Sequence, residues 1–257
     1  MEKASDWKQF WEARSRRAAS DFDFDHGASP GTEIEALSKE ELLNFIGPKP
    51  DERVFDAGCG TGGNMLLLHS KVKSIVGMDY SGGAVERCRR RIQSNNIDNA
   101  EVTEGSITQV PLPDSSVDKV LCMSVLQYVD DNEVKLAFEE FARILKDRGV
   151  LVLHVKNISS LYLATLWMAK RAKLLLGIRT KVEHYRSYRW YVRELESLGF
   201  AVLSYNSFQF FTVEGMPTSV VRFLQKLELK HRNKFPLRLG FLRRHGSELK
   251  IKAQLVR

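Results

Sequence analysis

The sequence predicts an α/β fold in which a mostly parallel β-sheet carries helices on both faces. Three observations support this prediction. Short apolar segments alternate with helical segments over residues 53–208, a glycine-rich turn follows the first apolar segment, and the last segment alternates apolar and polar residues. Apolar strands separated by helices are typical of a parallel sheet that is covered on both sides. The length of 257 residues suits one elaborated domain.

Helical spacing dominates the first fifty residues. Trp7, Phe10, Trp11 and Arg14 recur on one face and predict an amphipathic helix. A second helix over residues 33–45 ends before Gly47 and Pro48. The alternation that follows predicts strands at residues 53–56, 74–79, 100–104, 117–123 and 149–155. Helices are expected between them, at residues 64–70, 83–95 and 132–145.

The end of the chain departs from this alternation. A helix at 192–198 leads into a strand at 201–208, and about forty residues then separate that strand from the last one. The last strand alternates apolar with polar positions, namely Leu249, Ile251, Ala253 and Leu255 with Lys250, Lys252 and Gln254. Such a period of two predicts a half-buried strand that needs a partner. We treat the long connection as an insertion because it exceeds an ordinary hairpin loop.

These elements predict four regions along the chain. They are an N-terminal helical lid at 1–48, a sheet core at 49–208 with a basic cap helix region at 158–190, a basic helical insertion at 209–247, and a final sheet strand at 248–257.

Composition is that of an ordinary globular protein, with 43% hydrophobic and 28% charged residues. The three cysteines, Cys59, Cys88 and Cys122, show neither metal-ligand spacing nor a disulfide framework, so we expect no metal site and a reducing compartment. No secretory signal opens the chain, and the apolar stretch at 158–169 is too short to span a bilayer. A cytoplasmic protein is therefore expected.

Two segments carry the positive charge of this chain, whose net charge is +7. Residues 158–190 hold seven basic side chains against one acidic, and residues 217–245 hold eight against one. Both resemble basic amphipathic helices, which bind anionic membrane surfaces, cover a cleft that takes phosphate groups, or are simply solvated. Nucleic acid is a disfavoured partner because no aromatic-interleaved basic motif accompanies the charge.

A glycine-rich turn is the strongest motif. It reads Val54-Phe55-Asp56-Ala57-Gly58-Cys59-Gly60-Thr61-Gly62-Gly63 and connects a strand to a helix. Glycines there permit positive φ and let a ligand approach the backbone. Asp79 stands 21 residues after Gly58, at the end of the next strand, where its carboxylate can accept hydrogen bonds from ribose hydroxyls. This pair predicts an adenosine-bearing cofactor; the alternative is a turn that is merely tightly packed.

The glycine spacing alone permits two cofactors. Gly58, Gly60 and Gly63 satisfy the dinucleotide spacing, which leaves an NAD-dependent oxidoreductase as an alternative. Asp56 argues against it, because an acid there would repel a pyrophosphate but helps to hold the cationic amino-acid end of S-adenosyl-L-methionine (SAM). A P-loop is excluded, since Asn64 stands where that motif requires lysine.

Residues 54–62 with Asp79 resemble the class I SAM-dependent methyltransferase family, in particular its small-molecule and lipid- or glycan-modifying branch. The resemblance continues through residues 105–107, 110–113, 116–118 and 145–151. It implies SAM as cofactor and a Rossmann-like seven-stranded sheet whose last strand is antiparallel.

Carried over by position, the resemblance implies a set of cofactor contacts. Those to the methionine part are expected from Asp56, Ala57, Gly58, Cys59 and Gly60, and the others from Asp79 on the ribose, Tyr80 on the adenine face, Ser106 and Ile107 at the adenine edge, and Met123 closing the pocket. Many relatives carry Asp at the position of Ser106, so this contact is expected to be weaker than a charge-assisted one.

Methyl transfer requires alignment of the acceptor, which in this architecture approaches over the carboxyl ends of the strands. A hydroxyl acceptor also needs a base. His184 is predicted as base or acceptor contact, with a surface histidine as the alternative, and Tyr128 as a residue lining the acceptor pocket. His154 is either a second base candidate or a core histidine, and Trp11 and Arg14 are candidates for the lid.

The sequence thus predicts a SAM-dependent methyltransferase (EC 2.1.1) that O-methylates a small-molecule, glycan or lipid-linked acceptor. The basic helices add the hypothesis of a peripheral protein at the inner membrane face. The alternatives are an RNA methyltransferase, an NAD-dependent oxidoreductase, and a degenerate cofactor-binding module that scaffolds a partner.

Overall fold

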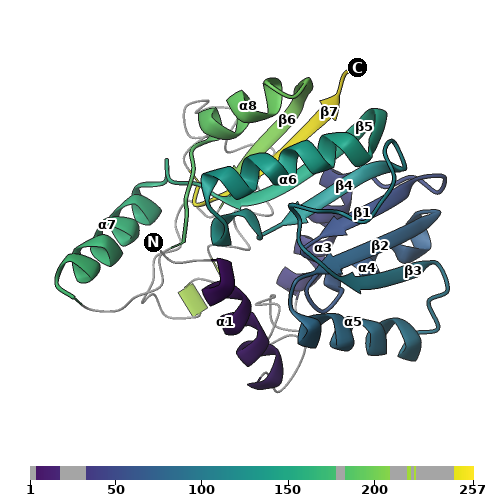
Figure 1. Cartoon of the computed structure of the whole chain (residues 1–257), viewed down its shortest axis with the longest axis horizontal. Coiled ribbons are helices and arrows are strands. Elements are labelled where there is room, and N and C mark those ends of the chain that lie inside the picture. Colours follow the sequence, from purple (N-terminus) through teal and green to yellow (C-terminus); the bar gives the residue numbers. More distant parts are fainter. Residues whose placement is uncertain (1–3, 18–32, 178–182, 209–218, 221–222, 224–245) are drawn as a thin grey trace.

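A seven-stranded sheet forms the centre of the molecule (Figure 1). The computed structural model describes residues 4–17, 33–177, 183–208, 219–220, 223 and 246–257. In the order β3-β2-β1-β4-β5-β7-β6, the strands are β3 (Ala100–Glu104), β2 (Ser74–Asp79), β1 (Arg53–Ala57), β4 (Val117–Met123), β5 (Leu145–Lys156), β7 (Glu248–Leu255) and β6 (Phe200–Phe208).

The pairing confirms the predicted topology. Strands β3, β2, β1, β4 and β5 pair in parallel. The last strand, β7, lies between β5 and β6 and is antiparallel to both, so it has a partner on each side. The chain therefore has the predicted Rossmann-like, mostly parallel sheet with an antiparallel final strand.

Helices occupy the predicted stretches with shifted ends. Their bounds are α1 (Ala4–Arg17), α3 (Glu33–Ile46), α4 (Gly63–Leu68), α5 (Gly82–Ser94), α6 (Asp131–Ile144), α7 (Leu161–Leu175) and α8 (Tyr188–Glu196), with short 3-10 turns η1 (His69–Lys71) and η2 (Leu126–Tyr128). N-terminal capping residues explain why two helices begin earlier than predicted. Asp130 and Glu133 form a capping box that starts α6, and the Ser187 side chain accepts the Trp190 amide and starts α8 four residues before the predicted helix.

The two faces of the sheet bury separate apolar clusters. One contains Phe138 and Phe141 of α6 with Tyr191 and Leu195 of α8. The other contains Ile46 of α3, Met65 and Leu68 of α4, and Cys88 and Ile92 of α5. Alternate residues of the central strands supply both clusters, as the pleat requires. The cysteines are free and buried, as expected of apolar fillers.

Two strand predictions need correction. Strand β5 begins at Leu145 rather than residue 149, because the chain passes directly from α6 into the sheet. Strand β7 is not uniformly half-buried: Lys250 is buried, because β7 is interior and the Lys250 ammonium pairs with the Glu41 carboxylate of α3. The predicted insertion at 209–247 lies almost wholly outside the described residues.

The predicted cap region contains one described helix, α7, which projects from the end of the sheet in Figure 1. Within the described ranges, no helix is both long and apolar enough to cross a membrane.

Candidate cofactor and acceptor site

Several predicted site residues meet at the carboxyl edge of the sheet. Ala57 of β1 is in register with Met78 of β2 and with Cys122 of β4, and Met123 is in register with His154 of β5. Segments that follow these strands therefore lie side by side. This is the edge at which ligands bind in open α/β sheets.

The glycine turn is packed tightly against the segment that follows β4. The amides of Gly58 and Cys59 both donate to the Met78 carbonyl, at 2.7 and 3.0 Å. Gly58 has a φ of +75°, and a Cβ built on it would lie 2.2 Å from Val125 Cγ2. Only glycine fits this position, because the backbone is left-handed and a side chain has no space.

Asp79 links the turn to the second strand. Its carboxylate accepts the Gly60 amide at 3.0 Å on one oxygen and the Ser81 amide at 2.9 Å on the other. A carboxylate offers about four acceptor positions, so bonds from ribose hydroxyls are compatible with these two. Asp79 therefore also shapes the turn, a role that the sequence did not reveal.

Two side chains of the glycine-rich stretch, Asp56 and Cys59, are buried. The Asp56 side chain is fully buried, and the Asn64 amide donates to it at 3.5 Å. Burial and the Asp56 charge raise the pKa of Cys122. The pKa of Cys59 is raised by its hydrogen bond to Cys88, by burial and by Asp56. The Cys59 side chain belongs to the core cluster that contains Cys88, so we expect only its backbone to contact a cofactor.

The expected adenine end is formed by three residues of differing exposure. Tyr80 is half-buried, and burial together with the Asp79 charge raises its pKa. Ile107 is buried, whereas Ser106 is exposed. The Ser106 hydroxyl is 2.8 Å from the Thr108 hydroxyl and stabilises the local turn.

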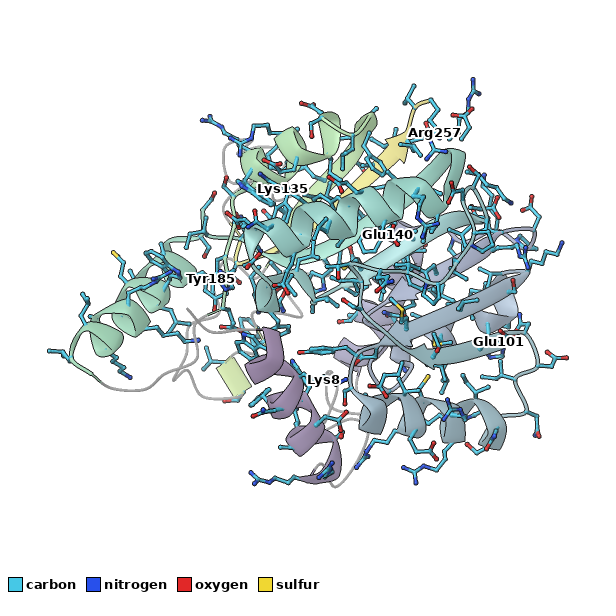
Figure 2. The ribbon with its side chains drawn as sticks, viewed as in Figure 1. Lys8, Glu101, Lys135, Glu140, Tyr185 and Arg257 are labelled. Atoms are coloured by element: carbon cyan, nitrogen blue, oxygen red, sulfur yellow. The ribbon has the colours of Figure 1, made fainter. Side chains whose placement is uncertain are left out.

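Helix α1 contacts the segment that follows β4 and the end of β3. Trp7 and Trp11 place their rings 4.7 and 5.3 Å from the ring of Tyr128, which follows β4. At the other side, Lys8 pairs with Glu104 at the end of β3, at 2.8 Å. In Figure 2, Lys8 lies between Tyr185, on the left, and Glu101, near the start of β3, on the right. Helix α1 thus lies at the carboxyl edge.

The N-terminal end of α5 also receives α1. Arg87 donates to the Ser15 carbonyl at 3.0 Å. A Cβ on Gly83 would lie 2.1 Å from Ser15 Oγ, so the two helices approach as closely as glycine allows.

A buried arginine organises the segment after β4. The Arg186 guanidinium donates to the carbonyls of Leu126 and Val129, at 2.7 and 2.8 Å, and to Asp131 at 2.7 Å. Next to it, the His184 amide donates to the Gln127 carbonyl at 2.8 Å. These bonds bring the two predicted acceptor-side residues, His184 and Tyr128, onto adjoining segments.

Burial changes the acidity of both residues. Burial and the nearby Arg186 charge lower the pKa of His184. Burial also raises the pKa of Tyr128 to about 12, with further contributions from the charges of Glu183 and Glu248. Tyr128 is therefore a neutral phenol at physiological pH.

A polar cluster that the sequence did not assemble lies at the ends of β4, β5 and β7. Ser124 Oγ is 3.3 Å from His154 Nδ1, and His154 Nε2 is 3.0 Å from a carboxylate oxygen of Glu248. Lys156 pairs with the same carboxylate. The residues are far apart in the sequence, so no spacing motif could have found the cluster; only the position of His154 at a strand end pointed to it.

The fold and this edge define the class I SAM-dependent methyltransferase architecture. Residues 54–149 match the family model described as "Methyltransferase domain". The chain therefore contains a class I SAM-dependent methyltransferase domain, which confirms the predicted resemblance and its cofactor, SAM. The predicted branch is not confirmed by this match.

Two named methyltransferases are similar to part of this chain. The chain is similar to the malonyl-[acyl-carrier protein] O-methyltransferase of Serratia marcescens, with 30% identity over 122 residues, 48% of this chain and 45% of the relative. It is also similar to a 23S rRNA (uracil(1939)-C(5))-methyltransferase of Xanthomonas campestris, with 39% identity over 67 residues, 26% of this chain and 15% of the relative. The chain spans less than half the length of these curated relatives.

A solved structure shares the fold over nearly the whole chain. The phosphoethanolamine N-methyltransferase 1 of Haemonchus contortus, in complex with phosphoethanolamine and S-adenosylhomocysteine, superposes with a TM-score of 0.69 at 17% identity. The match covers 98% of this chain and 49% of that one. Together the three proteins carry O-, C- and N-methyltransferase names, so the acceptor atom does not follow from the fold.

Proposed function

We propose that this protein is a SAM-dependent methyltransferase that O-methylates a small-molecule, glycan or lipid-linked acceptor at the carboxyl edge of the sheet. The observation that carries the proposal is the joint geometry of Gly58 and Asp79. Gly58 leaves no room for a side chain, and Asp79 holds the turn through the Gly60 amide. A preformed turn of this kind binds an adenosine-bearing cofactor without reorganisation.

In this proposal, each part of the cofactor is held by a different group of residues. Asp79 would bind the ribose hydroxyls, and the backbone of Gly58, Cys59 and Gly60 would bind the methionine part above buried Asp56. The adenine would lie between Tyr80 and the turn that contains Ser106 and Ile107, with Met123 closing the pocket. SAM supplies an electrophilic methyl group on a sulfonium; the protein aligns an acceptor with it and excludes water.

The acceptor side is built from different elements. Tyr128 and His184 would contact the acceptor, because both lie on the segments that Arg186 holds beside the carboxyl edge. Trp7 and Trp11 pack against Tyr128 from α1, so this helix would act as the lid over the cofactor. The burial that lowers the pKa of His184 keeps its imidazole neutral and able to accept a hydrogen bond.

Titration calorimetry tests the cofactor proposal. We expect S-adenosylhomocysteine to bind the purified chain and NAD to give no heat. Asp79→Ala should weaken the first binding by roughly 10–100-fold, since a hydrogen bond to a charged group contributes about 1.5–3 kcal/mol. The matched control is Glu101→Ala, which removes a carboxylate near the start of β3, at the opposite edge of the sheet from Asp79. Binding of NAD in place of S-adenosylhomocysteine would support the oxidoreductase alternative and overturn the proposal.

Helix α7 supports a lipid-linked acceptor at an anionic membrane surface. Its sequence contains Lys170, Arg171 and Lys173 and no acidic residue. Met168 in the middle of the helix is 56% exposed, and Leu175 and Leu176, at and just beyond its end, are 90% and 76% exposed. Apolar side chains beside basic ones are typical of helices that lie in a membrane interface. This helix would bring the acceptor side to the membrane face where the lipid is held.

Sedimentation with vesicles tests the membrane proposal. We expect the protein to pellet with vesicles of phosphatidylglycerol and phosphatidylcholine and to stay in solution with phosphatidylcholine alone. The double variant Leu175→Ser, Leu176→Ser should lose binding, whereas Leu136→Ser, an exposed leucine on α6, should retain it. Equal sedimentation of the wild type with both vesicle types, or with neither, would contradict an anionic-membrane partner.

A further inference from the structure

We propose that His154 accepts the proton of a hydroxyl acceptor during methyl transfer, with the Ser124 hydroxyl as the connecting group and Glu248 as the positioning residue. The proposal deepens the proposed methyltransferase function and rests on it. We therefore assign the role of base to His154 instead of His184, and His184 keeps only the proposed role of acceptor contact.

The three side chains form a continuous chain of contacts from the surface inward. Ser124 is exposed and lies 3.3 Å from His154 Nδ1. His154 has 21% of its side chain exposed, and Glu248, 3.0 Å from Nε2, has 6% exposed. The Ser124 amide also donates to the His154 carbonyl at 2.8 Å, which fixes the two segments relative to each other.

The charge of Glu248 sets which nitrogen carries the proton. Burial alone would raise the pKa of Glu248, but its close contacts with His154 and Lys156 outweigh burial and lower this pKa. Glu248 is therefore a carboxylate, which can only accept. When the His154 ring is neutral, the charge of this carboxylate, 3.0 Å from Nε2, favours the tautomer with the proton on Nε2 and the lone pair of Nδ1 facing Ser124.

The cluster adjoins the glycine turn. Ser124 directly precedes Val125, the residue whose methyl group abuts Gly58. Ser124 itself has a φ of +61°, a left-handed conformation that is unfavourable for a side-chain-bearing residue and that accumulates at functional sites. The hydroxyl is thus held beside the backbone that would contact the methionine part of SAM.

Other ionisable groups around the cluster are already engaged. From β5, Lys156 pairs with Glu248, and from β7, Lys250 faces His154 across the ladder but pairs with Glu41 of α3. From η2, Tyr128 contributes a phenol whose pKa the Glu248 charge helps to raise. Among these groups, His154 is the one in contact with the Ser124 hydroxyl, at 3.3 Å from Nδ1.

The proposed step balances in atoms and charge. The acceptor oxygen forms a bond to the methyl carbon, and the carbon–sulfur bond breaks with its electron pair left on sulfur. The acceptor proton passes to Ser124 Oγ as the Ser124 proton passes to His154 Nδ1. His154 becomes an imidazolium beside the Glu248 carboxylate and later releases the proton to water. Base catalysis of this kind contributes about 10²–10⁴-fold to a rate.

A spectroscopic experiment tests the geometry without an acceptor. Long-range proton–nitrogen spectra of the ¹⁵N-histidine-labelled chain, with S-adenosylhomocysteine added, report the tautomer of each histidine. His154→Gln assigns the signal, and His69→Gln is the matched control at a distant turn. We expect a neutral His154 protonated at Nε2, and a mixture of tautomers in Glu248→Gln. A proton on Nδ1 in the wild type, or an unchanged tautomer in Glu248→Gln, would overturn the proposal.

A turnover experiment tests the chemical role. Release of S-adenosylhomocysteine from SAM is measured with the lipid and metabolite extract of the producing cells. We expect His154→Gln to release it at least 100-fold more slowly than the wild type with unchanged affinity for S-adenosylhomocysteine, and Ser124→Ala to show a smaller loss. Equal release by His154→Gln would sink the proposal while leaving the methyltransferase function intact. A wild type that does not bind S-adenosylhomocysteine fails the proposed function instead, and the tautomer alone then decides whether the cluster exists.

Discussion

The proposed cofactor half and the proposed acceptor half of the carboxyl edge are built in different ways. In the cofactor half, the contacts are backbone amides of one turn and the carboxylate that follows the next strand, as in the bonds of Asp79 to Gly60 and Ser81. In the acceptor half, the contacts join residues distant in sequence, such as Arg186 with Leu126 and His154 with Glu248. The contacts of the first half join neighbouring segments of the chain, whereas those of the second half form only once the strands of the sheet have paired.

This difference predicts that substitutions in the two halves have separable effects. Changes in the glycine turn should act mainly on cofactor affinity. Changes in the acceptor half should act on stability and turnover while cofactor affinity stays nearly constant. The following variants are ordered from the largest expected effect to the smallest.

Gly58→Ala should reduce affinity for S-adenosylhomocysteine by roughly 100-fold, or nearly 3 kcal/mol. The new methyl group would overlap Val125, so the turn must move away from the position that binds the cofactor. Gly177→Ala is the matched control, because Gly177 has the same φ of +75° but has open space around it. Calorimetry on both variants separates close packing from backbone strain; equal losses in the two would refute the packing explanation.

Arg186→Gln should destabilise the fold by at least about 1–3 kcal/mol, because buried carbonyls of Leu126 and Val129 lose a charged donor. Urea unfolding measures the change. Arg193→Gln, which removes a guanidinium that is 71% exposed on α8, should cost no more than about 1 kcal/mol. A large fall in S-adenosylhomocysteine affinity, with the Arg186 variant still folded, would show that the two halves are coupled.

Trp11→Ala should speed dissociation of S-adenosylhomocysteine by roughly fivefold, since an aromatic pair contributes about 0.5–1.5 kcal/mol and Trp11 holds α1 against Tyr128. Stopped-flow fluorescence measures the rate. Gln9→Ala, on the exposed side of the same helix, should leave it unchanged. An unchanged rate in the Trp11 variant would argue against α1 as a lid.

Glu248→Gln should flatten the loss of stability in acid. The ordinary pKa of Glu is about 4.3, and that of Glu248 is lower in the folded chain. The stabilisation is therefore complete above the unfolded value and is lost as pH falls through the folded one. Melting curves from about pH 7 to about pH 3 should fall more steeply for the wild type. Parallel curves would mean that Glu248 is not held as a carboxylate.

The same division explains how far sequence analysis reached. The hydrophobic period and the glycine placement predicted the strands, including the final one, and the turn with Asp79, because each of these is encoded within a few neighbouring residues. The antiparallel direction of the final strand followed only from the family resemblance. Lys250 was expected at a half-exposed strand position, yet it is buried, because strand order decides burial and strand order is a long-range property. Glu248 escaped notice for the same reason: its partner His154 is reached only through the pairing of β5 with β7.

The position of β7 between β5 and β6 determines how the connection between β6 and β7 is attached to the sheet. Phe208, the last residue of β6, pairs with Glu248, the first residue of β7, so the connection between the two strands leaves and rejoins the sheet at neighbouring points. Both points lie at the edge where Lys156 pairs with Glu248. Insertions or replacements in this connection can therefore occur without altering a single rung of the ladder.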